Sequence, residues 1–243
     1  MAENSPDFDH ITTVIFDMDG TLIEHTWQLE RICEVQFAHF AEVLASPISQ
    51  EEFFDCYWAK CADMWYMMVD GVLDGYTAAK YGYINTLREL GLDTNLAEPM
   101  LHYWIELVLD EAVPFEDTFP VLKTVRQKYT TGILTNGFIH LQRKKIERYN
   151  LSAYVDFTLV SEESGYHKPD KLLFWEALKL AGETSPEKVL YVGDNLEADI
   201  KGALNAGLTP LLINVKNDLE PPEGVVKIKK LSALLALLGL ESD

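Results

Sequence analysis

The residues most suited to chemistry are four aspartates and one lysine. They come from distant parts of the chain, but each follows a short apolar run. Asp17 and Asp19 follow one short apolar run, Asp194 and Asp199 follow another, and Lys168 lies in the loop after a third. Carboxylates repel one another, so a hard divalent cation is the simplest reason for gathering them. Mg²⁺ is favoured because one or two carboxylates together with substrate phosphate suit it. The pattern therefore predicts a magnesium site.

Five short runs rich in β-branched residues are expected to be the strands that position these side chains. Helical patterns separate the last four runs, and this alternation predicts an α/β fold, a parallel sheet with helices on both faces. In such a sheet ligands bind outside the carboxyl ends of the strands, and the aspartates and Lys168 follow the predicted strands at these ends. The runs are Thr12–Phe16, Gly132–Leu134, Asp156–Val160, Val189–Val192 and Pro210–Ile213, and the helical patterns are Ile139–Tyr149, Lys171–Ala181 and Leu196–Ala206.

The stretch between the first two strands is much longer than the roughly 30 residues of a strand–helix–strand unit. It reads as four helices, so we expect an α/β core of residues 1–22 and 114–243 and a helical cap of residues 23–113. Large side chains crowd the second helix, and we expect them to fill the cap's core rather than bind a ligand. The Gly71–Gly75 loop is a candidate substrate-facing segment. The expected helices are Trp27–Leu44, Gln50–Val69, Thr77–Leu90 and Leu96–Glu111, and the large side chains are Phe53, Phe54, Tyr57, Trp58, Trp65, Tyr66, Met67 and Met68.

Each motif also has an ordinary structural interpretation. Asp17 opens a calcium-loop pattern, but Leu22 stands where that loop needs glycine, and a strand precedes it instead of a helix. Thr135-Asn136-Gly137 suits a helix cap and turn, Lys168 suits a solvated surface position, and Gly193-Asp194-Asn195 suits a tight turn. The arrival of all of these in order at strand ends favours a functional site.

The composition of the chain limits the classes of molecule that it is expected to bind. The 243 residues include 20 Lys+Arg and 39 Asp+Glu, a net charge of -19, which disfavours nucleic acid and anionic membranes as partners. No apolar run approaches the roughly 18–20 residues of a membrane span, and the first ten residues do not resemble a signal peptide, so a cytoplasmic protein is expected. The basic run Arg143-Lys144-Lys145 with Arg148 is expected to be a solvated helix face. Cys33, Cys56 and Cys61 are expected to be buried free thiols.

Taken together, these motifs resemble the four motifs of the haloacid dehalogenase-like (HAD) hydrolases. The matching segments are the Asp-x-Asp-Gly-Thr-Leu of Asp17–Leu22, the apolar run that closes in Thr135, the Lys168-Pro169 pair and the Gly193–Asp199 segment. The resemblance covers the expected core. It implies a Rossmann-like core and, for a helical insertion between the first two motifs, a type C1 cap.

The resemblance also implies roles. Asp17 resembles the nucleophile, Asp19 the general acid/base, Thr135 the hydroxyl that binds the transferring phosphoryl group, Lys168 the cation that neutralises it, and Asp194 a metal ligand. This allocation is consistent with the physics, because a carboxylate that attacks a phosphate dianion needs positive charge nearby.

Three further roles complete the implied site. Asp17 and Asp194 resemble metal ligands through their carboxylates, and Asp19 through its backbone carbonyl. Asn136 is expected to offer the phosphate a backbone N–H at the start of a helix. Asp199 resembles a residue that orients Lys168 or a metal-bound water.

Within the family, the stretches ILTNGF, SEESGYHKPD and GDNLEADIKGALNAG look most like intracellular 5′-nucleotidases and related small-metabolite phosphatases. This implies hydrolysis of a small phosphorylated metabolite, with nucleoside monophosphates as the first candidates. Members that displace a halide do not keep an aspartate at the place of Asp19, which argues against dehalogenation. A phosphotransferase or mutase and a non-catalytic HAD-like binding protein remain as alternatives.

Overall fold

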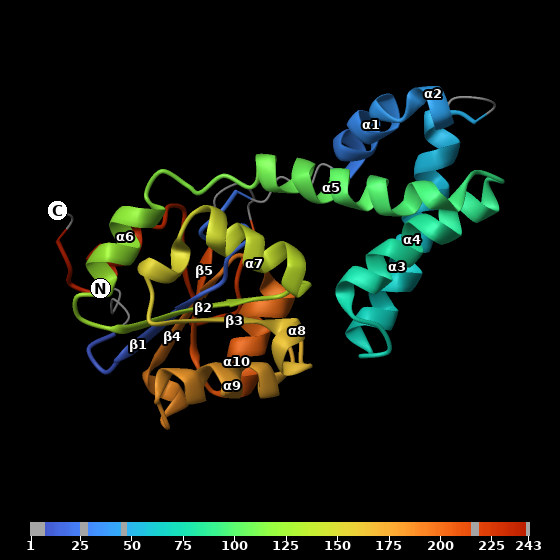
Figure 1. The fold of residues 1–243 in the computed structure, drawn as a ribbon. Helices are drawn as coiled ribbons and strands as arrows, with labels where there is room; N and C mark the ends of the chain where they lie inside the picture. The colour runs from blue at the N-terminus through green and yellow to red at the C-terminus, as the bar shows by residue number, and fades with distance from the viewer. Residues whose placement is uncertain (1–7, 25–28, 45–47, 215–218, 242–243) are drawn as a thin grey trace. The chain divides into compact units, whose positions relative to one another are not determined.

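The computed structural model describes residues 8–24, 29–44, 48–214 and 219–241 and is drawn in Figure 1. The chain divides into two compact units. The first contains residues 1–25, 113–137 and 142–243, and the second contains residues 26–112 and 138–141. This division differs from the expected core and cap at residues 23–25, 113 and 138–141.

The first unit is built on a six-stranded parallel sheet in the order β3-β2-β1-β4-β5-β6, which confirms the predicted α/β class. The sequence predicts the first five strands, whereas β6 has only three residues and is too short to show a period. The strands are β1 (Thr13–Phe16), β2 (Thr130–Thr135), β3 (Phe157–Val160), β4 (Val189–Gly193), β5 (Thr209–Ile213) and β6 (Val226–Ile228).

The register of the sheet brings the ends of three strands side by side. Phe16, the last residue of β1, lies opposite Ile133 of β2 and Val192 of β4. The chain runs from β1 to β2 and β3 on one side, then returns to β4 on the other side of β1. Such a reversal is the place where open α/β sheets bind ligands, so the residue after Phe16 stands at the expected binding edge.

Helices cover both faces of this sheet, with α6 and α7 on one side and α9 and α10 on the other (Figure 1). Apolar side chains of α9 and α10 pack on the strands and form the core of that layer. The helices of this unit are α6 (Thr118–Val125), α7 (Ile139–Arg148, of which residues 139–141 are counted in the second unit), α8 (Ser161–Ser164), α9 (Lys171–Ala181), α10 (Gly202–Ala206) and α11 (Ala233–Leu237), with short turns η2 (Leu151–Ala153), η3 (Pro186–Lys188) and η4 (Leu196–Lys201).

The predicted helix Leu196–Ala206 begins as a π-helical turn, η4. The Asn195 side chain caps it by accepting hydrogen bonds from the N–H groups of Glu197 and Ala198, both at 2.9 Å. Wide turns of this kind often mark functional sites because they re-aim a side chain. Here the turn carries Asp199 back against Gly193, whose missing Cβ would lie 2.5 Å from the Asp199 Cγ.

The second unit is helical, and its helices begin at recognisable caps. The Ser49 hydroxyl accepts from the N–H of Glu52, and the Asp74 carboxylate accepts from the N–H of Thr77. The helices are α1 (Leu29–His39), α2 (Ala41–Leu44), α3 (Gln50–Val69), α4 (Gly75–Glu89) and α5 (Ala97–Glu111), with the turn η1 (Thr94–Leu96). The first expected helix is therefore divided near Phe40.

The expectation that the large side chains of α3 all fill the cap's core is wrong for half of them. Four of the eight are at least 42% exposed. Successive helix residues point about 100° apart, so one buried stripe cannot take in every member of adjacent pairs such as Trp65-Tyr66. The buried members are Phe53, Tyr57 and Met68, Phe54 is partly buried, and the exposed members are Trp58, Trp65, Tyr66 and Met67.

The cysteines are free thiols, as expected, although only Cys33 is fully buried. Burial raises the pKa of Cys33 to about 12, which disfavours the reactive thiolate. No helix among the described residues is long and apolar enough to cross a bilayer.

Candidate active site

The carboxyl ends of β1 and β4 bring three aspartates together. Asp17 follows β1, Asp194 follows β4, and η4 returns Asp199 to the same place. One carboxylate oxygen from each lies within 4.8 Å of the others. Gly20 permits this approach, because at a φ of +87° it turns the chain so closely that an added Cβ would lie 2.1 Å from an Asp194 oxygen.

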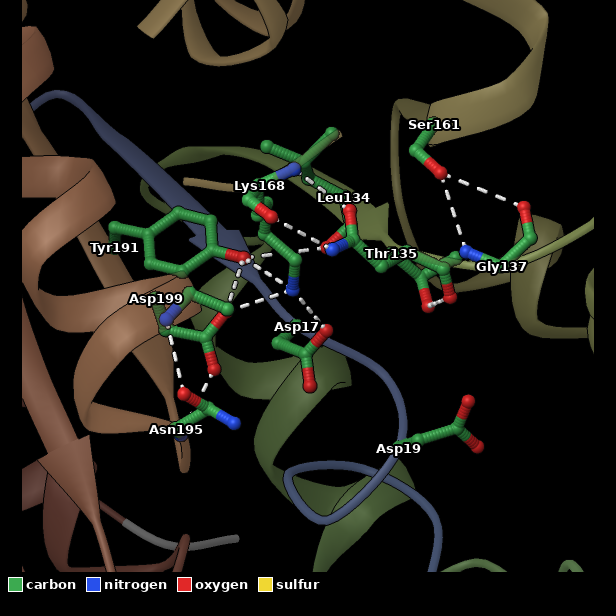
Figure 2. Close-up of polar contacts among 12 residues, drawn as sticks. Asp17, Asp19, Leu134, Thr135, Gly137, Ser161, Lys168, Tyr191, Asn195 and Asp199 are labelled. Carbon is green, nitrogen blue, oxygen red and sulfur yellow. Dashed lines mark hydrogen bonds and ion pairs between the residues drawn. The ribbon is translucent and has the colours of Figure 1, made fainter. Parts of the chain in front are cut away.

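Lys168 lies buried between two of these aspartates (Figure 2). Its Nζ is 2.5 Å from Asp17 Oδ1 and 2.6 Å from Asp199 Oδ1. Burial by itself lowers the pKa of this lysine, but the charges of Asp17 and Asp199 outweigh it and hold the pKa well above its usual value. Lys168 is therefore a fixed cation beside Asp17 rather than a solvated surface residue.

Tyr191 of β4 completes the surroundings of the ammonium group (Figure 2). Its hydroxyl is 3.1 Å from Lys168 Nζ and 3.2 Å from Asp199 Oδ1, and it donates to the Leu134 carbonyl at 3.2 Å. Tyr191 is not among the residues predicted from the sequence to belong to the site. The available signal was a tyrosine in an otherwise apolar buried strand, since a buried hydroxyl usually has a polar partner.

The backbone N–H of Asn195 donates to Asp199 Oδ2 at 2.9 Å. Both oxygens of Asp199 thus have donors from the chain, and it is fixed as a partner of Lys168. Asp199 contacts Lys168 directly, and its predicted role of orienting the lysine stays a prediction.

The three clustered aspartates outnumber the one cation, Lys168, that contacts two of them. Burial raises the pKa of Asp17 well above its usual value despite the opposing effect of Lys168, and Asp199 and Asp194 raise it further. Burial, followed by the charge of Asp199, raises the pKa of Asp194 to about 7. Both directions mean that the cluster favours added positive charge, from a proton or from a metal ion. Hard oxygen donors of this kind suit Mg²⁺, so the donor set fits the predicted metal.

The last residue of β2 and the loop after it hold the predicted phosphate-binding residues. Thr135 Oγ1 accepts from Gln142 Nε2 at 2.7 Å. The Asn136 side chain bonds the backbone of Lys168 twice, accepting from its N–H at 2.8 Å and donating to its carbonyl at 3.0 Å. Asn136 is predicted to act through its backbone N–H, but its side chain has a second role, because it joins the loop after β2 to the segment that carries Lys168.

A second contact joins the same loops. Ser161, fully buried at the start of α8, accepts from the N–H of Gly137 at 3.1 Å and lies 2.9 Å from Nδ1 of His167. Burial lowers the pKa of His167, which favours its neutral form. Together with Asn136, this contact fixes the segment that carries Lys168.

Asp19 is not a member of the cluster of three aspartates, and it lies apart from Asp17 and Asp199 in Figure 2. Its Oδ1 accepts from Lys145 Nζ and its Oδ2 from Gln142 Nε2, both at 2.8 Å. The expectation that the basic run on α7 is a solvated face is therefore wrong for Lys145, which is 2% exposed. Lys144 is exposed as expected. Lys145 and Gln142 are not predicted from the sequence as partners of Asp19, because helix periodicity does not show which remote carboxylate faces them.

Comparison with known proteins places this arrangement among hydrolases. A family model described as a haloacid dehalogenase-like hydrolase matches residues 11–207. The pyrimidine 5′-nucleotidase YjjG of Escherichia coli (strain K12) is 37% identical over 131 residues, which cover 54% of this chain and 58% of that protein. The N-acylneuraminate-9-phosphatase of Homo sapiens is 28% identical over 222 residues, covering 87% of this chain and 85% of that protein.

Among solved structures, a 2-haloacid dehalogenase from Pseudomonas syringae pv. Tomato DC3000 matches 94% of this chain and 98% of its own with a TM-score of 0.73. The two sequences are 24% identical in this match. The likeness therefore establishes a shared fold, and the chemistry has to be argued from the residues of this chain.

Proposed function

Because the chain belongs to the haloacid dehalogenase-like hydrolase family, we propose that it is a Mg²⁺-dependent phosphomonoesterase in which Asp17 is the nucleophile. The observation that carries the proposal is the position of Asp17, which stands at the carboxyl end of β1 with one oxygen 2.5 Å from Lys168 Nζ and in the same cluster as Asp194. A carboxylate in these surroundings can meet a phosphate dianion without prohibitive repulsion.

The proposed reaction has two steps. An Asp17 oxygen attacks phosphorus, the bond from phosphorus to the leaving oxygen breaks, and the Asp19 carboxyl group gives its proton to that oxygen. A water molecule then attacks the aspartyl phosphate, gives a proton to Asp19, and releases phosphate and the Asp17 carboxylate. Lys168 neutralises charge on the transferring group, and the Thr135 hydroxyl and the Asn136 N–H bind its oxygens.

The proposed metal ligands are the carboxylates of Asp17 and Asp194 and the backbone carbonyl of Asp19. Bound there, Mg²⁺ would neutralise charge on both the nucleophile and the phosphate. Asp199 is assigned a different role because both its oxygens already accept hydrogen bonds within the chain. It positions Lys168.

The proposed substrate is a small phosphorylated metabolite, with nucleoside 5′-monophosphates as first candidates. The names of two relatives support this class: one is a pyrimidine 5′-nucleotidase and another is an N-acylneuraminate-9-phosphatase. The second, helical unit is the proposed source of substrate selection, since the phosphate chemistry is assigned entirely to residues of the first. A cytoplasmic location stays a prediction.

Two other reactions are distinguishable by experiment. A phosphotransferase or mutase would pass the phosphoryl group from Asp17 to a hydroxyl, so ¹⁸O from labelled water would not enter the product phosphate. Dehalogenation is suggested by the fold match, but a halide leaves without a proton, which gives Asp19 no task. The presence of Asp19 thus favours phosphoryl transfer over dehalogenation.

The test is a panel of metabolite phosphates incubated with the whole chain, with Mg²⁺ and with chelator, and scored for release of inorganic phosphate. A 2-haloacid in the same panel, scored for halide release, is the direct competitor. We expect metal-dependent phosphate release and no halide. Halide release without phosphate release would refute the proposal.

A further inference from the structure

Two side chains of α7, Gln142 and Lys145, donate hydrogen bonds to the carboxyl group of Asp19. Gln142 and Lys145 are three positions apart on the helix and therefore point to the same face. Each is 2% exposed, and each takes a different oxygen: Lys145 Nζ lies 2.8 Å from Oδ1, and Gln142 Nε2 lies 2.8 Å from Oδ2. A carboxyl group held at both oxygens has a fixed position and a fixed rotation.

The same amide links Asp19 to the predicted phosphate-binding loop. Gln142 Nε2 also lies 2.7 Å from Thr135 Oγ1 and 3.0 Å from the Asn136 carbonyl. Gly137 makes room for this contact, because a Cβ at that position would lie 2.8 Å from the Gln142 Cγ. One side chain thus sets the distance between the carboxyl group and the threonine hydroxyl.

Folding stability does not account for this arrangement. Burying an ammonium group is costly unless it is paired, and a buried ion pair is often no more stabilising than apolar residues of similar volume. Lys145 lies on an amphipathic helix beside the apolar Leu141 and Ile146, both buried, so an apolar residue would suit its position as well. The pair with Asp19 calls for a reason in chemistry.

We propose that Gln142 and Lys145 are positioning residues that hold the Asp19 carboxyl group, relative to Thr135, for proton transfer to the leaving oxygen. This inference rests on the function proposed above. The two residues touch neither the transferring phosphoryl group nor its leaving oxygen in this scheme; they act through Asp19. Precise placement of a catalytic group is worth a large rate factor, and an error of about 1 Å can cost about 10²-fold.

The test compares leaving groups. An alkoxide needs a proton when it leaves, whereas p-nitrophenolate is stable as an anion and needs almost none. The variants are Lys145→Met and Gln142→Met, and Lys144→Met, on the exposed side of the same helix, is the matched control. Each is assayed in a single turnover, with enzyme in excess, on p-nitrophenyl phosphate and on the best alkyl phosphate of the panel.

We expect Lys145→Met and Gln142→Met to slow alcohol release from the alkyl phosphate by about 10- to 100-fold. Phenolate release should change by less than about threefold in Lys145→Met. In Gln142→Met it should also slow, because Gln142 contacts the Thr135 hydroxyl, but by less than alcohol release does. Lys144→Met should match the wild type on both substrates. Equal losses on the two substrates, or no loss on either, would overturn the inference.

A double variant separates positioning from general damage. If Lys145 acts through Asp19, then Lys145→Met should slow the alkyl reaction little further in an Asp19→Asn background, because the group that it positions has lost its proton. If the rate loss of the double variant equals the product of the losses of the two single variants, Lys145 acts independently of Asp19. Should Lys145→Met fail to fold by circular dichroism, Lys145→Gln replaces it, since it keeps a donor but not the charge, and the same comparisons apply.

The outcomes distinguish this inference from the function on which it rests. A wild type that releases no phosphate from any substrate refutes both. If the wild type is active but Asp19→Asn slows the reactions of both substrates equally, Asp19 is not the acid. Gln142 and Lys145 then have no catalytic acid to position. A leaving-group effect in Asp19→Asn that is absent from the Lys145 and Gln142 variants refutes only the inference.

Discussion

Replacing Gly20 with alanine should damage the metal site far more than it damages the fold. The residue has a φ of +87°, and an added Cβ would lie 2.1 Å from Asp194 Oδ2 and 2.6 Å from its Cγ. Real Cβ contacts shorter than 3.0 Å are essentially never found, so the carboxylate must retreat by roughly 1 Å. Asp194 is one of the proposed magnesium ligands.

Two effects of different size follow. Alanine in the left-handed backbone region costs about 1–2 kcal/mol of unfolding free energy relative to glycine. The clash itself adds little to this cost, because the contacted atoms are the end of a side chain that can rotate. Its effect on function is larger, since displacing a ligand by about 1 Å can cost about 10²-fold in rate.

The matched control is Gly182→Ala, in the same unit. Gly182 has a φ of +68° with no atom within 4 Å of an added Cβ, so this variant carries the backbone cost without the clash. Urea denaturation measures the unfolding free energy of both variants, and phosphate release is titrated with Mg²⁺. We expect similar losses of stability, and a weaker apparent Mg²⁺ affinity with slower turnover only in Gly20→Ala.

Two results would contradict this reasoning. Wild-type Mg²⁺ affinity and rate in Gly20→Ala would show that Asp194 does not need its present position. An equal loss of activity in Gly182→Ala would show that backbone strain alone, and not contact with the carboxylate, impairs the enzyme.

Three further predictions can be tested alongside this one. Asp17→Asn should abolish phosphate release, because the amide is neither a nucleophile nor a good metal ligand, and turnover by this variant would remove Asp17 from its proposed role. Chelation should abolish phosphate release by the wild type, because it removes the metal, and turnover in chelator would contradict the proposed Mg²⁺ dependence. Tyr191→Phe should lower the free energy of unfolding by about 1–3 kcal/mol and slow turnover, because Lys168, Asp199 and the Leu134 carbonyl each lose a hydrogen-bond partner. An unchanged urea midpoint would contradict this. Replacing the Gly71–Gly75 loop should change relative rates across the metabolite panel but not those on p-nitrophenyl phosphate, and an unchanged panel would locate specificity elsewhere.

Local patterns in the sequence were sufficient for most of the fold. Strands β1 to β5 and helices α3, α7 and α9 agree with the predicted ranges to within a few residues, because apolar periodicity and capping residues act over short stretches of chain. Parallel strands place their carboxyl ends at one edge, so the convergence of Asp17, Asp194 and Lys168 also followed from the order of elements.

The partners of individual side chains required the tertiary structure. Lys145 reads as one member of a basic helix face, yet it is buried against a carboxylate 126 residues away. Tyr191 reads as a strand residue, yet its hydroxyl is part of the Lys168 network. Half of the large side chains on α3 read as core but are exposed. Periodicity fixes which residues share a face of an element, whereas the neighbours of that face come from distant parts of the chain and are set only when the elements pack.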